Sequence, residues 1–173
     1  MWPLIQSCLV ILVAFVFQAT IVPHMAISGA KPDVVLIVTA LYGFTYGSRN
    51  GMLIGFFGGL LGDLLAGSYV GLGMASKSIV GFFAGLVQRT IFVENLLIPM
   101  FAIFVATWIN EFIYVAFLFL FGEITPVEML VSKIILPSAI YNAILTPFVY
   151  GAVRRFMVFK QGTPVTRIAR KYD

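Results

Sequence analysis

Long apolar runs separated by short polar stretches fill the chain from residue 3 to residue 150. A helix needs roughly 20 apolar residues to cross a bilayer, so this pattern predicts six membrane-spanning helices. The second and third runs are short, and we expect those helices to be tilted or to lie where the bilayer is thin. The expected spans are Pro3–Val22, Pro32–Gly47, Gly51–Ala66, Val70–Gln88, Asn95–Phe121 and Pro126–Tyr150.

Composition supports a membrane protein. The 173 residues are 61% hydrophobic and only 10% charged, and a soluble domain of this size has too little interior to bury so many apolar side chains. We therefore expect an all-α integral membrane protein, with one six-helix domain at residues 1–153 and a tail at 154–173. The first apolar run has no basic residue before it and no small-residue cleavage site, which favours a retained span over a removed signal peptide.

The basic residues predict the orientation. With six spans both termini lie on one side, and the positive-inside rule makes the side richer in Lys and Arg cytoplasmic. Only Lys31 lies in a loop on the opposite side. The side of the termini carries Arg49, Arg89, Arg154, Arg155, Lys160, Arg167, Arg170 and Lys171.

The tail from Arg154 to Asp173 holds six basic residues and one acid, so the rest of the chain nets −1 of the total +4. A solvated tail and weak attraction to anionic lipid are both compatible with this charge. Nothing else in the sequence favours nucleic-acid binding.

Three helix signals involve proline. The segment "TPVE", residues 125–128, places a capping hydroxyl, a first-turn proline and a glutamate at the start of the sixth span. Pro137 and Pro147 lie inside that span and are expected to bend it. Pro32 and Asp33 suit the amino end of the second span, where a carboxylate stabilises the helix dipole.

Glycines predict close helix packing. They recur at spacings of three and four in the third span and again in the fourth, which places them on one side of each helix. Small residues let helix backbones approach in a membrane, where apolar burial alone provides no drive. The segments "GFFGGLL" at 55–61 and "GFFAGLV" at 81–87 repeat this pattern. The predicted packing glycines are Gly51, Gly55, Gly58, Gly59, Gly62, Gly81 and Gly85.

Four charged residues fall inside the predicted spans: Asp63, Lys77, Glu111 and Lys133. Counted at about 1.5 Å per residue from the outer ends of their spans, all four are expected in the outer half of the bundle. Because charges inside a membrane are costly unless paired, we expect a neutral cluster that locks spans three to six together, with Asp63 paired to Lys77. We also expect this cluster, and Asp63 in particular, to support the surface that a partner helix uses. A polar pocket that opens outward and binds a partner or a small molecule is the alternative. Asn110 and Asn142 are expected to hydrogen-bond between helices.

Signals of catalysis or metal binding are poor. His24 is the only histidine, and neither His-Glu-x-x-His nor Gly-x-Ser-x-Gly occurs. Ser76 and Ser78 flank Lys77, but neighbouring residues on a helix point apart, so a Ser-Lys pair would need a second helix. Cys8 is the only cysteine. We expect no enzyme activity, no cofactor and no metal.

Three segments form a combination that is typical of one known family: "KPDVVLIV" at 31–38, "GFFGGLLGDLLAGSYVGLG" at 55–73 and "NEFIYVAFLF" at 110–119. They resemble the MreD family of rod shape-determining proteins. The middle segment is similar to the family signature G-F-x-x-G-x-x-x-D-x-x-x-G-x-x-x-G. The residues that fill the signature positions are Gly55, Phe56, Gly59, Asp63, Gly67 and Gly71. Pro32 and Asp33 match the family's basic-Pro-Asp/Asn entry into a span in the first segment. Lys77 and Lys133 belong to no part of this pattern.

The resemblance implies a non-catalytic component of the bacterial elongation machinery in the cytoplasmic membrane. Such a protein binds MreC and works with MreB, RodA and the transpeptidase that builds sidewall peptidoglycan; a homodimer is left open. The resemblance also implies the fold of the six-helix substrate-binding subunits of energy-coupling-factor transporters. A vitamin-binding transport subunit is therefore the competing interpretation, and a ligand cavity would distinguish it.

Overall fold

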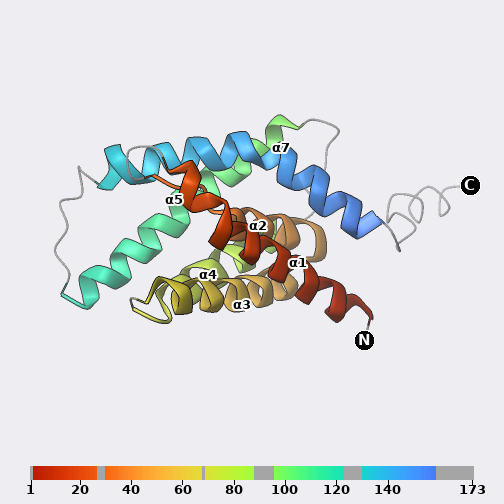
Figure 1. The fold of residues 1–173 in the computed structure, drawn as a ribbon, viewed down its shortest axis with the longest axis horizontal. Coiled ribbons are helices and arrows are strands. Elements are labelled where there is room, and N and C mark those ends of the chain that lie inside the picture. The colour runs from red at the N-terminus through yellow and green to blue at the C-terminus, as the bar shows by residue number, and fades with distance from the viewer. Residues whose placement is uncertain (1, 27–29, 68, 88–95, 123–129, 159–173) are drawn as a thin grey trace, which may run out of the picture.

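The computed structural model describes residues 2–26, 30–67, 69–87, 96–122 and 130–158. This part of the chain is all-helical (Figure 1). The α-helices are α1 (Trp2–Thr20), α2 (Val34–Tyr46), α3 (Ser48–Ala66), α4 (Leu72–Leu86), α5 (Leu97–Leu120) and α7 (Leu136–Val158). A short 3-10 helix, η1 (Val22–Met25), follows α1, and a π-helical turn, η2 (Val131–Ile135), precedes α7.

Helix α2 lies at the centre of the molecule, in contact with α1, α3, α4, α5 and α7 (Figure 1). Every residue from Val34 to Phe44 is buried. The sequence of α2 is apolar on all sides, which is typical of a helix enclosed by others. The expected all-α fold is confirmed for the described residues. Helix α2, which lies within the predicted second span, is the core helix of the fold.

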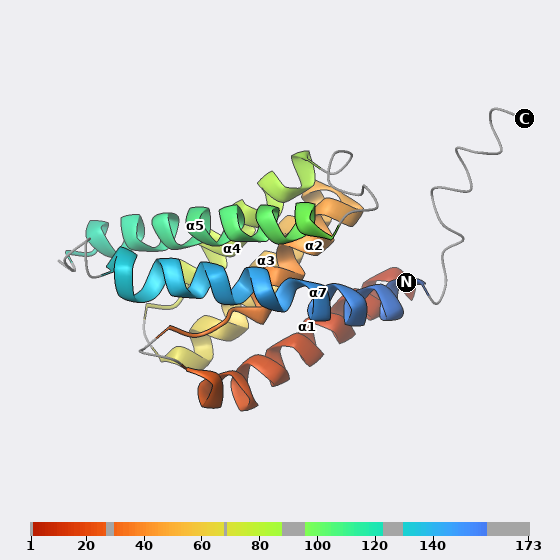
Figure 2. The ribbon, with the colours of Figure 1, turned by 90° about the horizontal axis from the view of Figure 1, so that it is seen from above.

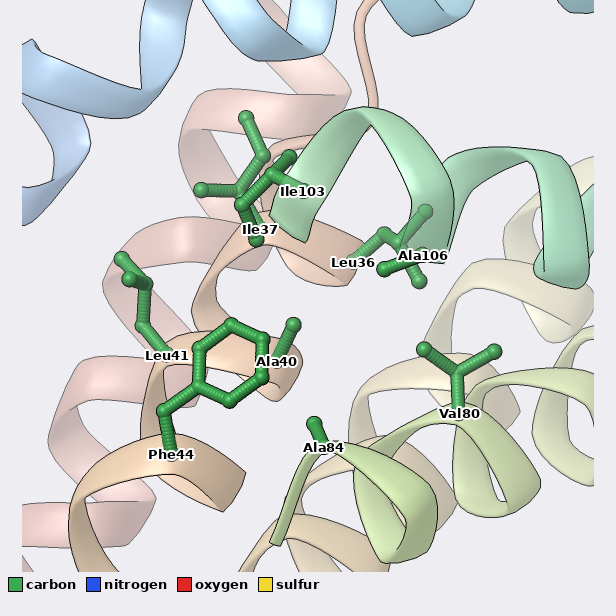
Figure 3. Close-up of a cluster of buried hydrophobic side chains, with 9 residues drawn as sticks. All are labelled: Leu36, Ile37, Ala40, Leu41, Phe44, Val80, Ala84, Ile103 and Ala106. Carbon is green, nitrogen blue, oxygen red and sulfur yellow. The ribbon is translucent and has the colours of Figure 1, made fainter. Parts of the chain in front are cut away.

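The core has two parts on different sides of α2. Figure 3 shows the first, where α2 meets α4 and α5; its residues are Leu36, Ile37, Ala40, Leu41, Phe44, Val80, Ala84, Ile103 and Ala106. The second joins α1, α2 and α3 with the end of α7, and includes Val10, Val38, Ile54 and Val153. Because α2 contributes to both parts, it fixes the positions of its neighbours.

The other helices form two pairs. Helices α3 and α4 pack against each other as a hairpin, and α5 runs beside α7 (Figure 2). Helix α1 contacts α2 and α3 and touches α7 only sparsely.

Two segments of the described chain are long and apolar enough to cross a membrane, residues 97–120 and 131–153. Helices α2 and α4 have 13 and 15 residues. At 1.5 Å per residue they are about 20 and 23 Å long, shorter than the hydrocarbon core of about 30 Å. Six complete crossings therefore remain a proposal.

The end of the chain differs from expectation. Helix α7 continues to Val158, eight residues beyond the expected end at Tyr150, so the first residues assigned to the tail are helical. The π-helical turn precedes Pro137, which has no N–H to donate to a helical carbonyl. The predicted capping segment 125–128 lies outside the described residues.

Candidate functional site: buried polar groups and glycine contacts

An ion pair joins the start of α2 to the middle of α4. Lys77 Nζ lies 2.8 Å from Asp33 Oδ2, and the two side chains are 15% and 21% exposed. The other carboxylate oxygen of Asp33 accepts a hydrogen bond from the backbone N–H of Leu36 at 2.9 Å, so Asp33 also caps α2. The prediction that Lys77 pairs with Asp63 is therefore wrong, because the acidic partner of Lys77 is Asp33. A carboxylate has two oxygens, and Asp33 uses one for the cap and one for the cation.

The same end of α2 is tied to α5 and α7. The backbone N–H of Asp33 donates to Asn142 Oδ1 at 2.7 Å, and Asn142 Nδ2 donates to Thr107 Oγ1 at 3.0 Å. Asn142 and Thr107 are fully buried. Because α2 begins here, its first N–H groups have no partner within the helix, and Asn142 supplies one. Asn142 thus bridges three helices.

Gln18 connects helix α1 to the start of α2. Gln18 Oε1 accepts from the backbone N–H of Val34 at 2.8 Å, and Gln18 Nε2 donates to the carbonyl of Pro32 at 3.1 Å. Sequence reasoning singled out neither Gln18 nor Thr107. An uncharged amide or hydroxyl costs less in an apolar segment than a charge does, so it gives a weaker signal. Helices α1, α4, α5 and α7 are therefore all tied to the start of α2.

Of the two remaining charged residues, Glu111 lies near the ion pair and Lys133 is exposed. Glu111 is partly buried on α5, accepts from Asn110 Nδ2 at 3.1 Å and lies close enough to interact electrostatically with Lys77 and Asp33. Lys133 is exposed on η2, so its predicted place in the buried cluster is corrected. Asn110 hydrogen-bonds within its own helix, and its Oδ1 is buried without a partner among the described residues.

Asp63 caps α4 from the last turn of α3. Its carboxylate accepts from the backbone N–H groups of Gly71 at 2.8 Å, Gly73 at 3.1 Å and Met74 at 3.0 Å. These are among the groups that an α-helix leaves free at its amino end, where a negative charge is also favoured by the helix dipole. Asp63 is 8% exposed, so these bonds replace water as its partners.

The glycines near Asp63 make this cap sterically feasible. Gly67 ends α3 with φ +64° and Gly71 precedes α4 with φ +111°, conformations that other residues rarely adopt. A Cβ on Gly73 would collide with the Asp63 carboxylate. The motif from Asp63 to Gly73 is thus a structural unit that closes the α3–α4 hairpin. The signature residue Phe56 lies apart from it, 39% exposed.

Helices α2, α3 and α4 touch backbone to backbone through glycine. A Cβ on Gly51 would collide with the carbonyl of Gly81 and the Cα of Gly43, and a Cβ on Gly81 would collide with the carbonyl of Gly51. The same collision would occur between Gly55 and the carbonyl of Lys77. Further contacts are Gly59 with Gly73 and Met74, Gly85 with Ser48, and Gly58 with the side chain of Val35.

Gly62 is an exception among the predicted packing glycines, because a Cβ there would meet nothing within 4 Å. Its spacing places it above Gly58, but no neighbour comes close at that level. Gly62 is therefore removed from the packing set.

The described residues contain no group of three His, Cys, Asp or Glu side chains that could hold a metal ion. The hydroxyls beside Lys77 bond to carbonyls of their own helix: Ser76 Oγ to Gly73 at 3.3 Å and Ser78 Oγ to Met74 at 2.6 Å. The arrangement of this region ties helices together, and its polar atoms are largely used for that purpose.

Comparison with known proteins gives one match. The model of a family described as rod shape-determining protein MreD matches residues 3–159 of the 173-residue chain. Neither the curated proteins nor the solved structures gave a match. The match covers the described helices from Pro3 onward, including the Asp63 cap, the glycine contacts and the Asp33–Lys77 pair. The chain belongs to the MreD family of rod shape-determining proteins, which are membrane proteins and structural components of the system that determines rod shape.

Proposed function

We propose that the protein is a non-catalytic membrane scaffold of the machinery that builds sidewall peptidoglycan, and that it binds MreC. In this proposal it works in a wider complex with MreB, RodA and an elongation transpeptidase. The observation that carries the proposal is the family match over residues 3–159. The internal use of the buried polar groups supports a scaffold, because they fix helix positions instead of facing a ligand.

The competing interpretation, a vitamin-binding transport subunit, calls for a cavity lined by polar groups specific to the ligand. In the described region, Asp33, Lys77 and Asn142 bind one another or helix backbone. A cavity among the described residues, between α1 and α7, is lined by apolar side chains. These observations favour the scaffold.

We place the surface for the partner on the outer side of the α3–α4 hairpin. Two pairs of neighbouring phenylalanines are exposed there, Phe56 with Phe57 and Phe82 with Phe83. Aromatic side chains are enriched at protein interfaces, and a membrane-spanning helix of MreC would meet them without crossing the core. The Asp63 cap and the glycine contacts hold this hairpin rigid, so Asp63 supports the surface from behind without touching the partner.

The proposal includes six crossings with both termini in the cytoplasm. Arg49 and Arg155, both on the predicted cytoplasmic side, are exposed, and the positive-inside rule supports this orientation. The test is labelling of a single cysteine at Asp173 in a Cys8→Ser background. A membrane-impermeant reagent should reach it only after the cells are opened, and labelling of intact cells would contradict the topology.

Photo-crosslinking tests the partner and the surface together. A photoreactive amino acid at Phe57 or Phe83, which are 51% and 52% exposed, should capture MreC in cells. The matched control is Phe101 on α5, which is 69% exposed and should capture little. Equal capture at Phe101 would contradict the hairpin surface. Failure to co-purify MreC with the unmodified chain, or to restore rod shape in a strain lacking its own MreD, would contradict the function.

A further inference from the structure

An apolar groove runs between α1 and α7, with α2 as its floor. Its cavity volume is about 240 Å³. All the side chains along it are apolar; they include Val13 and Phe17 of α1, Val38 of α2, and Phe148 and Ala152 of α7. Helices α1 and α7 touch only sparsely, and the groove between them is partly open to the surroundings of the bundle.

A basic side chain stands at one end of the groove. Along α7 the lining positions are 145, 148, 149, 152 and 153, the i, i+3, i+4 pattern of a single helix face. Arg155 follows Ala152 by three positions and Phe148 by seven, so it lies at the edge of this face, in line with Phe148 and about one turn beyond Ala152. Arg155 is exposed. The groove is therefore apolar along its length and positively charged at its end.

The length and lining of the groove suit one hydrocarbon chain. From residue 145 to residue 153 the lined stretch of α7 is about 12 Å long, at 1.5 Å per residue. A chain of methylene groups needs only apolar contacts, and every side chain along the groove supplies them. The basic side chain of Arg155 follows at the end of this stretch, where an acyl chain carries its charged headgroup.

We propose that the groove holds one acyl chain of an anionic phospholipid whose phosphate pairs with Arg155. A guanidinium binds phosphate oxygens with two parallel hydrogen bonds, which gives geometric selectivity as well as charge. The positive-inside rule places this end of α7 near the cytoplasmic headgroups, where anionic lipids attract Lys and Arg. The lipid would complete the packing between α1 and α7, which touch only sparsely.

The four basic residues after Val158 offer attraction to anionic lipid by charge alone. The proposal is therefore tested on the full chain, so that these four residues are the same in every protein compared. The purified, delipidated protein in detergent is titrated with dioleoyl phosphatidylglycerol or with dioleoyl phosphatidylcholine. Native mass spectrometry then counts the lipids that stay bound.

The unmodified protein should retain one phosphatidylglycerol in preference to phosphatidylcholine. Arg155→Ala and Ala152→Phe should each weaken that binding about tenfold, a change of about 1.4 kcal/mol. The first removes the cation and the second fills the groove from a position that is exposed. Arg49→Ala, which removes an exposed basic residue of α3, should bind as the unmodified protein does. Melting temperatures of all variants show whether each one is folded.

Three results would overturn the proposal. Equal weakening by Arg155→Ala and Arg49→Ala would mean diffuse attraction to charge. Equal retention of the two lipids with no effect of Ala152→Phe would mean that the groove selects nothing. A cysteine at Ala152 that crosslinks to a protein partner in the membrane would mean that a helix lies there. None of these outcomes depends on MreC binding, so the lipid site and the proposed function can fail separately.

Discussion

Two helix pairs in this protein pack in opposite ways. In the α3–α4 pair, Gly51, Gly55 and Gly59 bring the backbones into direct contact. In the α1–α7 pair, Phe17 and Phe148 line a groove between the helices. Both pairs are apolar, so hydrophobicity does not explain the difference. In a membrane, lipid is as apolar as the helices, and contact depends on how closely the backbones can approach.

Polar bonds add specificity to the tight region. Asp33 joins α2 to α4 through Lys77, and its backbone joins α2 to α7 through Asn142. Asp63 joins the end of α3 to the start of α4. Unlike dispersion contacts, these bonds have fixed partners and directions, so they select one arrangement of helices that could otherwise slide. On α1, Gln18 makes its bonds to residues 32 and 34 at the start of α2.

The largest effect is expected from adding a methyl group where three backbones meet. Gly51→Ala should lower the free energy of unfolding by about 3 kcal/mol, because its Cβ collides with Gly81 and Gly43 and backbone must move. Gly62→Ala is the matched control on the same helix. It should raise stability by about 0.5–1 kcal/mol, since alanine favours a helix and the site is open. Unfolding titrations in mixed micelles measure both, and equal effects would contradict the glycine contact.

The next effect concerns the ion pair. Lys77→Met leaves the Asp33 carboxylate without its cation and should cost about 2–3 kcal/mol, less than a fully buried pair because both side chains retain some exposure. In a double-mutant cycle, Asp33→Asn and Lys77→Met together should cost less than the sum of the two. Asp63→Asn and Lys77→Met should be close to additive, within about 0.5 kcal/mol. Strong coupling of Asp63 with Lys77 would restore the pair that the sequence predicted.

A smaller effect is expected at the cap of α4. Asp63→Ala leaves three backbone N–H groups without their carboxylate acceptor and should cost about 1–2 kcal/mol, the usual range for loss of a helix cap. Asp63→Asn keeps one acceptor oxygen and should lose less. Hydrogen exchange should quicken at Gly73 and Met74 in Asp63→Ala. Unchanged exchange there would show that the cap does not hold the hairpin closed.

The sequence predicted the helices and most of the glycine contacts for clear reasons. Apolar length indicates a helix in a membrane protein, and a spacing of three or four places Gly51, Gly55 and Gly59 on one face. Spacing says nothing about which neighbour lies opposite, so Gly62 was included although its face is open. Helical periodicity defines the face of one helix, and only the tertiary arrangement defines the contact.

The charge pairing was predicted less well. Lys77 was assigned to Asp63 because the two are neighbours in chain order at similar depth. The turn through Gly67 and Gly71 instead brings the start of α4 back onto Asp63, where backbone N–H groups satisfy the carboxylate. Lys77 is then left for Asp33, which the sequence identified only as a cap. A side chain that caps a helix can also bind a second group, and the local cap signal does not indicate that second partner.

The smallest effect is expected at Ala152, where the same substitution is compared with one in the closely packed region. Ala152→Leu adds three carbons to the open α1–α7 groove and should change the free energy of unfolding in lipid-free detergent by less than about 0.5 kcal/mol. Ala84→Leu adds the same atoms to α4, where Ala84 is 6% exposed and faces Gly43, and should cost about 1–3 kcal/mol. The same unfolding titration measures both. If Ala152→Leu cost as much as Ala84→Leu, the groove would be as closely packed as the α2–α4 contact, and the difference between the glycine-packed helices α2, α3 and α4 and the α1–α7 pair would not hold in the membrane-extracted protein.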